Sequence, residues 1–251
     1  MELIWLISLF FISFLAGLID SIAGGGGLLM IPSLLLSGIS PQFALGTNKL
    51  ISSSGTSVAV FNFVRKKKTQ VKIAASGILF ALVGSYLGSK AILSFEPELV
   101  GKIIIFLLPL AVIITLYPKK AKASKKSLSK KDLFIKIPII CFCIGFYDGF
   151  FGPGTGSFLA IAFYAFVGLG LLEATANAKI INLLTNIGAL IGFIIAGKVI
   201  YAVAIPLAFA NMLGNYTGSK LAITKGEKVI KTFLTISLVI LLITLIWKFL
   251  L

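Results

Sequence analysis

Residues 17–50 read GLIDSIAGGGGLLMIPSLLLSGISPQFALGTNKL. The stretch places Asp20, a run of four glycines and then Lys49 within otherwise apolar sequence. Four adjacent glycines end a helix, because glycine loses the most backbone freedom in a helix and readily adopts positive φ. A charge surrounded by apolar residues is costly, so the stretch predicts a broken helix with a functional or structural use for its two charged groups.

A second copy of this pattern lies in the other half of the chain. Residues 145–182 read GFYDGFFGPGTGSFLAIAFYAFVGLGLLEATANAKIIN. Here Asp148 corresponds to Asp20, and Lys179 corresponds to Lys49. A costly pattern that occurs twice indicates an internal repeat rather than chance.

The repeat extends beyond these two stretches. GSYLGSK at 84–90 recurs as GNYTGSK at 214–220, with five of seven residues identical. The offset of 130 residues is the same as that between Lys49 and Lys179. The glycines and serines of this motif predict close packing of helices, since small side chains let two backbones approach.

The composition is that of an integral membrane protein. Of the residues, 58% are hydrophobic and 12% charged, and the mean hydropathy is +1.08. Apolar runs of about 17 to 25 residues are long enough to cross a bilayer as helices. A membrane β-barrel would instead show short alternating segments.

The formal net charge of +15 fits a membrane topology better than nucleic-acid binding. The 23 basic residues lie mostly in loops between apolar runs and are not interleaved with aromatic residues. Under the positive-inside rule, loops 65–72 and 118–136 are predicted to be cytoplasmic. The chain has no histidine, and its two cysteines lie in one apolar segment, so no metal site, cofactor or disulfide is predicted.

The apolar runs predict about five helical segments in each half. Residues 1–117 form the first transmembrane repeat, 118–136 a basic linker and 137–251 the second repeat. The predicted segments are 3–23, 28–45, 47–64, 73–93 and 99–117, followed by 137–151, 157–172, 177–196, 199–217 and 229–249. The pattern predicts about eight full spans plus two short or broken helices, and leaves open whether 28–45 and 157–172 cross the membrane or are re-entrant.

The distribution of lysines favours opposite orientation of the two halves. With five crossings per half, the basic loops 65–72, 118–136 and 220–231 fall on one side of the membrane. A parallel arrangement would move the 220–231 cluster to the other side. The predicted fold is therefore an all-α polytopic membrane protein built from two inverted repeats.

Inverted repeats with broken helices predict an anion site near the middle of the membrane. Helix N-termini at the two glycine breaks offer unsatisfied N–H groups and a positive dipole end, and the lysines add full charge. The candidate substrate-binding residues are Gly24, Gly25, Gly26, Gly27, Thr47, Asn48, Lys49, Gly152, Gly154, Thr155, Gly156, Asn177, Lys179 and Asn182, with Asn186 as a further donor.

Two interpretations of the aspartates remain open. Asp20 and Asp148 either cap the glycine breaks or pair with Lys49 and Lys179 as structural ion pairs, or they couple transport to protons. The glycine runs have a simpler alternative as packing surfaces. They are not a P-loop, because neither copy ends in Gly-Lys-Ser/Thr.

These motifs closely resemble the sulfite exporter TauE/SafE family of membrane transporters, also called the TSUP family. The resemblance rests on GLIDSIAGGGGLLMIP with GTNKL, and on GFYDGFFGPGTGSF with ANAKIINLLTNIGAL. It implies a permease of the cell (plasma or inner) membrane for small sulfur-containing or organic anions, such as sulfite or sulfonates. The family's Asn-Lys motif falls on Asn48-Lys49, whereas the second copy has Ala178 before Lys179.

The predicted function is therefore secondary transport of a small anion by alternating access. An anion channel is the alternative, and a membrane-embedded enzyme is disfavoured because the chain lacks a nucleophile–base motif and a metal-ligand set. The expected partners are the anionic substrate and the lipid bilayer, without nucleic acid. A homodimer is left open.

Overall fold

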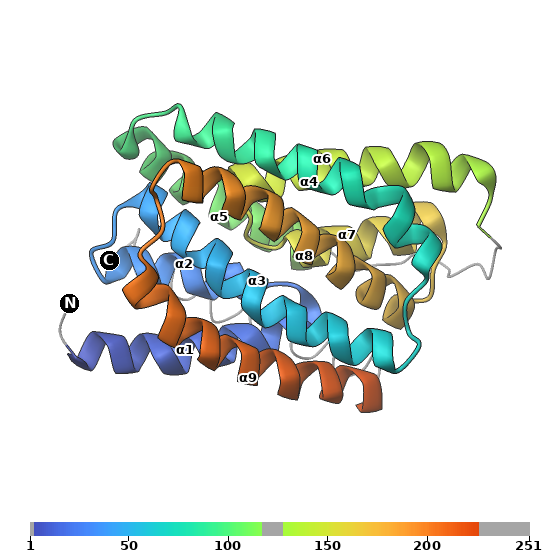
Figure 1. The fold of residues 1–251 in the computed structure, drawn as a ribbon, viewed down its shortest axis with the longest axis horizontal. Coiled ribbons are helices and arrows are strands. Elements are labelled where there is room, and N and C mark those ends of the chain that lie inside the picture. The colour runs from blue at the N-terminus through green and yellow to red at the C-terminus, as the bar shows by residue number, and fades with distance from the viewer. Residues whose placement is uncertain (1–2, 117–127, 226–251) are drawn as a thin grey trace.

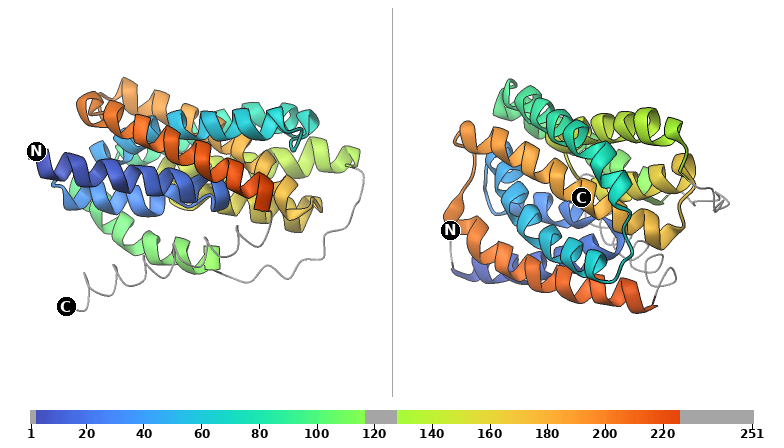
Figure 2. Two further views of the ribbon diagram at one scale, coloured as in Figure 1. Left: turned by 90° about the horizontal axis from the view of Figure 1, so that it is seen from below. Right: turned by 45° about the vertical axis from the view of Figure 1, so that its right-hand side comes forward.

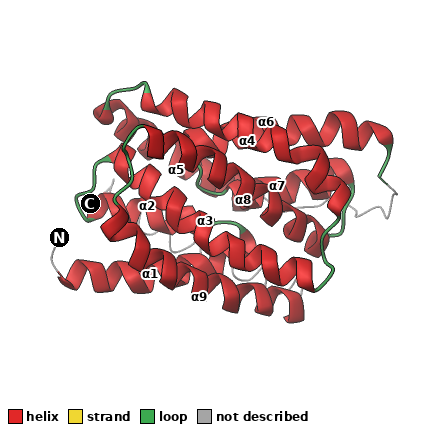
Figure 3. Cartoon of the chain, in the orientation of Figure 1, coloured by secondary structure: helices red, strands yellow, loops and turns green. Residues whose placement is uncertain are grey.

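The computed structural model describes residues 3–116 and 128–225, and all regular structure within them is helical, without a strand (Figure 3). The elements, in chain order, are α1 (Leu3–Ala23), α2 (Gly26–Leu36), α3 (Pro41–Arg65), α4 (Val71–Leu93), α5 (Pro97–Leu116), η1 (Asp132–Lys136), α6 (Ile137–Phe150), α7 (Thr155–Ala162), η2 (Phe163–Val167), α8 (Leu171–Ile195) and α9 (Tyr201–Lys225). The elements η1 and η2 are π-helical turns.

The long helices lie side by side along one axis of the molecule (Figure 1, Figure 2). Among the described residues, four helices are long and apolar enough to cross a membrane, and they cover Trp5–Ala23, Val71–Leu93, Asp132–Phe150 and Leu171–Ile195. The predicted class, an all-α polytopic membrane protein, is confirmed. The number of spans stays a prediction, and the predicted segment 229–249 lies outside the described residues.

Two short apolar segments, α2 and α7 with η2, are too short to cross a bilayer. At about 1.5 Å per residue, the 11 residues of α2 span about 16 Å, and α7 with η2 spans about 20 Å. A hydrocarbon core of about 30 Å needs more. The helix α2 packs alongside α1 and leads the chain back towards the end where α1 begins (Figure 1).

The helices that carry the two lysines begin earlier than predicted. The second segment was expected to run to residue 45, yet α2 ends at Leu36 and α3 begins at Pro41. Proline suits the first helical position, where its missing N–H needs no partner. In the second half α8 begins at Leu171 instead of residue 177, after a left-handed glycine at Gly168 (φ 84°).

The two lysines therefore do not lie at the starts of their helices. Counting from the first residues of α3 and α8, Lys49 and Lys179 are each the ninth residue. Both side chains are buried two turns inside a 25-residue helix, where the neighbouring elements surround them.

Helices from the two halves of the sequence are exchanged in the bundle. The helix α4 packs chiefly against α6 and α8, whereas α9 packs against α1 and α3. At the centre, α3 packs against α8. The predicted division at 118–136 is thus a division of the sequence, and the packing of the helices crosses it.

Glycines form the seams between the exchanged helices. A Cβ on Gly88 of α4 would lie 2.1 Å from the carbonyl oxygen of Phe146, and one on Gly214 of α9 would lie 2.0 Å from that of Phe14. Real Cβ contacts are never this short, so only glycine permits the approach. The predicted role of the repeated GSK-type motifs in close helix packing is confirmed.

The helix ends that adjoin the basic stretches 65–72, 118–136 and 220–231 lie at one end of the molecule. In Figure 1 α3 and α9 end at the right, where α6 begins, and these are the ends that adjoin the basic stretches of the sequence. The equivalent helices α1 and α6 start at opposite ends of the bundle. Opposed directions are what an inverted repeat requires, although the repeat and the cytoplasmic position of the loops stay predictions.

Candidate functional site

The α3–α8 interface carries a cluster of buried polar side chains at the centre of the bundle. On α3 these include Asn48, Lys49 and Thr56, and on α8 Lys179 and Asn186. Residues three to four positions apart lie on one face of a helix. The buried polar residues of α3 and α8 lie where these two helices pack against each other. Polar residues at this depth need partners.

Two ion pairs cross between the halves of the sequence. The Nζ of Lys49 lies 2.8 Å from Oδ2 of Asp148, and the Nζ of Lys179 lies 2.9 Å from Oδ2 of Asp20. The Lys49 and Asp148 side chains are only 3% and 2% exposed. Pairing of these aspartates with these lysines was one of the two interpretations open in the sequence; the crossing of the pairs between halves was not predicted.

The carboxylates also receive hydrogen bonds from the glycine breaks. The Thr155 hydroxyl at the start of α7 donates to Oδ1 of Asp148 over 2.7 Å, and the backbone N–H of Gly26 donates to Oδ1 of Asp20 over 3.4 Å. Each aspartate thus lies at the positive end of the short helix of its own half. From the sequence, Thr155 and Gly26 were predicted to bind a substrate anion.

The two glycine breaks are in direct contact. Gly24 has a φ of +83°, and a Cβ there would lie 2.3 Å from the carbonyl carbon of Gly156. The hydroxyl of Ser157 donates a hydrogen bond to the carbonyl oxygen of Ala23. Because both the space and the backbone conformation at Gly24 require glycine, the contact depends on the glycine-rich sequence of both copies.

A small polar cavity lies between the breaks. Its volume is about 10 Å³, close to the least that holds one water molecule. The residues that line it are Asp20, Gly24, Gly27, Asn48, Lys49, Ser52, Asp148, Gly152, Gly154, Thr155, Gly156, Asn182 and Asn186. Both members of the Lys49–Asp148 pair reach this cavity, whereas Lys179 is not among its lining residues.

Several candidates from the sequence lie outside the cavity lining. Thr47 accepts a hydrogen bond from the backbone N–H of Ile200, and Asn177 accepts one from the backbone N–H of Gln70. The two contacts are equivalent in the repeat, because the offset of 130 residues relates Thr47 to Asn177 and Gln70 to Ile200. Each contact holds the residue that directly precedes a helix, α4 or α9. Gly25 and Gly26 also lie off the lining, at the N-cap and the first residue of α2.

Sequence reasoning missed two side chains of the site. Ser52 lines the cavity, and its hydroxyl donates to Oδ1 of Asn48 over 3.4 Å. Thr56 donates to Oδ2 of Asp20 over 3.3 Å. A four-residue spacing from Asn48 through Ser52 to Thr56 was the available signal, because such spacing marks one helix face.

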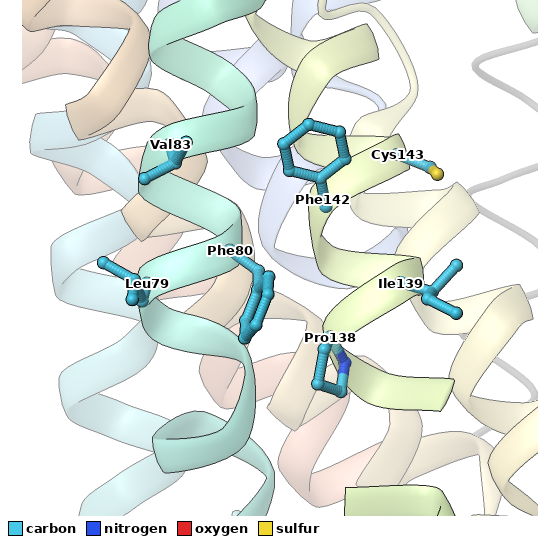
Figure 4. A pocket seen from close by; sticks show the side chains of 7 residues that line it. All are labelled: Leu79, Phe80, Val83, Pro138, Ile139, Phe142 and Cys143. Carbon is cyan, nitrogen blue, oxygen red and sulfur yellow. The ribbon is translucent and has the colours of Figure 1, made fainter. Parts of the chain in front are cut away.

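A larger hollow on the bundle surface has a different chemistry. It lies between α4 and α6, and its volume is about 430 Å³ (Figure 4). All seven lining side chains are apolar or weakly polar: Leu79, Phe80, Val83, Pro138, Ile139, Phe142 and Cys143. A surface of exposed apolar side chains on a membrane helix pair suits lipid tails and offers nothing to a small anion.

The sequence of residues 9–245 matches that of the sulfite exporter TauE/SafE family. The chain belongs to this family. The match covers both glycine breaks and both lysines, so the resemblance noted in the sequence is confirmed.

Named relatives of this TauE/SafE chain are membrane transporters. It is 39% identical over 230 residues to the probable membrane transporter protein YfcA of Escherichia coli strain K12, which covers 91% of this chain and 84% of YfcA. It is 37% identical over 241 residues to the probable membrane transporter protein ORF9 of Sinorhizobium sp, with 95% and 91% covered. A probable membrane transporter of Haemophilus influenzae is 34% identical, with 91% and 89% covered. No solved structure matches the chain.

Proposed function

We propose that this membrane transporter is a secondary carrier of small anions, with sulfite, sulfonates or related organic anions as its substrate class. The observation that carries the proposal is the cavity beside Lys49, enclosed by the two glycine breaks where the halves meet. A buried lysine with neutral amide neighbours suits an oxyanion, because N–H groups and a full positive charge complement its oxygens.

The carrier interpretation is favoured over a channel by the small size of the cavity. A channel needs a continuous path, whereas the space between the tightly packed breaks has a volume of about 10 Å³ and holds one water molecule at most. Broken helices that meet at the middle of the membrane are the usual place for substrate in carriers that rock one bundle against another. Catalysis forms no part of the proposal.

The two lysines have different proposed tasks. Lys49 binds the anion together with the amides of Asn48, Asn182 and Asn186, all of which line the cavity. Lys179 holds the halves together through its pair with Asp20, because it lies off the cavity lining. We also assign the protein to the cell (plasma or inner) membrane, with loops 65–72 and 118–136 on the cytoplasmic side.

A thermal-shift experiment tests the site. Purified protein in detergent or nanodiscs is heated with a panel of small sulfur oxyanions, sulfonates and carboxylates, because a ligand of the native state raises the unfolding midpoint with concentration. We expect one class of anion to raise the midpoint of wild-type protein. The effect should vanish in Lys49→Ala combined with Asp148→Asn and persist in Lys179→Ala combined with Asp20→Asn.

Counterflow in proteoliposomes then distinguishes a carrier from a channel. An anion trapped inside should accelerate uptake of labelled anion by a carrier and leave channel flux unstimulated. A midpoint shift that survives loss of Lys49 would move the site elsewhere, and absence of any shift with all three anion classes would reject the proposed substrates.

A further inference from the structure

We propose that the Asp148 carboxylate occupies the place of the substrate anion on Lys49, and that it yields this place by taking up a proton, so that one proton travels with each negative charge. This inference rests on the proposed function and adds the coupling of anion transport to protons. The geometry behind it is the 2.8 Å contact between Lys49 Nζ and Asp148 Oδ2 at the small polar cavity.

The two ion pairs of the site balance each other in charge. Lys49 and Lys179 carry two positive charges, and Asp20 and Asp148 carry two negative charges, all in side chains that are at most 12% exposed. Among the described residues this cluster is therefore neutral without substrate. A further anion would leave a net negative charge in a poorly solvated place, which is strongly unfavourable unless a positive charge enters with it.

The cavity is too small to hold an oxyanion while Asp148 is paired with Lys49. A cavity of about 10 Å³ holds one water molecule at most, so an oxyanion beside Lys49 requires the carboxylate of Asp148 to move away from the ammonium group. A proton that bonds to Oδ2 turns the carboxylate into a neutral carboxyl group. Lys49 then loses its counterion and pairs with the substrate anion. The Thr155 hydroxyl stays within hydrogen-bonding distance of Asp148 Oδ1.

The choice of Asp148 over Asp20 follows from the cavity lining. Lys49 and Asp148 both line the cavity, whereas Asp20 is paired with Lys179, which does not. Lys49 has a second acceptor at 3.2 Å in Oδ1 of Asn186, so its ammonium group stays held in the site when the carboxylate leaves. The Lys179–Asp20 pair remains closed throughout.

Asp20 is the one other carboxylate among the described residues that line the cavity, and it is already paired with Lys179. The charged group in contact with Asp148 is Lys49 on α3, and the other pair of the cluster is Asp20 on α1 with Lys179 on α8. The neighbouring Tyr147 donates its hydroxyl to the carbonyl oxygen of Pro153 over 2.7 Å. The helix α7 supplies the Thr155 hydroxyl, α4 meets this turn of α6 through Ser85 and Ser89, and the sequence has no histidine.

Proteoliposomes with labelled methanesulfonate test the coupling. This anion keeps one negative charge throughout the usable pH range, so an effect of pH reports on the protein. With the outside more acidic, we expect wild-type protein to accumulate methanesulfonate about tenfold per pH unit at equilibrium, because one pH unit corresponds to about 1.4 kcal/mol. A potassium diffusion potential should leave this ratio unchanged, since proton and anion move together without net charge.

The variant Asp148→Asn separates coupling from transport. We expect it to abolish the pH-driven accumulation while exchange of methanesulfonate remains measurable. Asp20→Asn is the matched control and should keep the accumulation ratio, which is an equilibrium quantity that a slower variant still reaches. Should Asp148→Asn fail to fold, proton uptake by weakly buffered wild-type protein on addition of methanesulfonate gives the stoichiometry directly, and one proton per bound anion is expected.

The outcomes distinguish the inference from the function on which it rests. Exchange of methanesulfonate without pH-driven accumulation, or without proton uptake, overturns the coupling and leaves the carrier intact. Accumulation that persists in Asp148→Asn and disappears in Asp20→Asn assigns the proton to the other pair and overturns the choice of Asp148. Absence of exchange with both methanesulfonate and sulfite overturns the proposed function together with the coupling.

Discussion

The two ion pairs have the same residue types and nearly the same lengths, 2.8 and 2.9 Å, yet their surroundings differ. At the position related by the 130-residue offset, Thr56 donates to the carboxylate of Asp20, whereas Asn186 accepts from the ammonium group of Lys49. One neighbour thus holds an aspartate and the other holds a lysine. Both residues of the Lys49–Asp148 pair line the cavity, whereas of the other pair Asp20 lines it and Lys179 does not.

Removal of single charges gives the largest expected effect. Lys49→Ala and Lys179→Ala each leave a buried carboxylate unpaired, so we expect each to lower the free energy of unfolding by about 3–5 kcal/mol. The matching neutralisations, Asp148→Asn and Asp20→Asn, should restore most of this loss. Chemical or thermal unfolding in detergent measures the loss of stability. Anion counterflow should recover when Lys179→Ala is combined with Asp20→Asn, and should stay lost when Lys49→Ala is combined with Asp148→Asn. Recovery in both double variants would show that the two pairs are equivalent.

Alanine at the helix seams tests whether the two halves are equal in packing. Gly88→Ala and Gly218→Ala both place a methyl group within 2.5 Å of a backbone oxygen across the seam, so each should cost about 1–3 kcal/mol. Gly170→Ala, where nothing lies within 4 Å, is the control and should be nearly neutral. The unfolding midpoint measures all three. A large difference between Gly88→Ala and Gly218→Ala would show unequal seams.

The hydroxyl groups beside the carboxylates provide a smaller test. Thr155→Val removes the donor to Asp148, and Thr56→Val removes the donor to Asp20, so each should destabilise the protein by about 1 kcal/mol. The functional effects should differ: Thr155→Val should change the pH dependence of counterflow, and Thr56→Val should leave it as in wild type. Equal pH profiles for both variants would contradict the separation of tasks.

The smallest effect is expected at the apolar hollow between α4 and α6. Phe80→Leu keeps an apolar side chain on an exposed apolar surface, so stability should change by less than about 0.5 kcal/mol and counterflow should stay at the wild-type rate. Reconstituted protein provides both measurements. A marked loss of counterflow would give the hollow a role in transport and weaken the contrast with the central site.

Much of the fold was predictable from the sequence, because hydropathy and the glycine breaks depend on local composition. The helix starts were not: the predicted segment 28–45 runs past Pro41, although proline suits the first turn of a helix and α3 begins there. The partners of the lysines were not predictable either. Spacing along the chain puts Lys49 after Asp20, whereas its partner Asp148 lies in the other half of the sequence and meets Lys49 only through tertiary packing.

The crossed pairing of Asp20 with Lys179 also constrains how the protein is made. The two residues are separated by 159 positions, so at about 5–20 residues per second a ribosome delivers the lysine roughly 8–30 s after the aspartate. During that interval the first helices enter the bilayer with an unmatched acid and without α9, against which α1 packs. The earliest part of the chain therefore completes its assembly only after most of the protein has been translated.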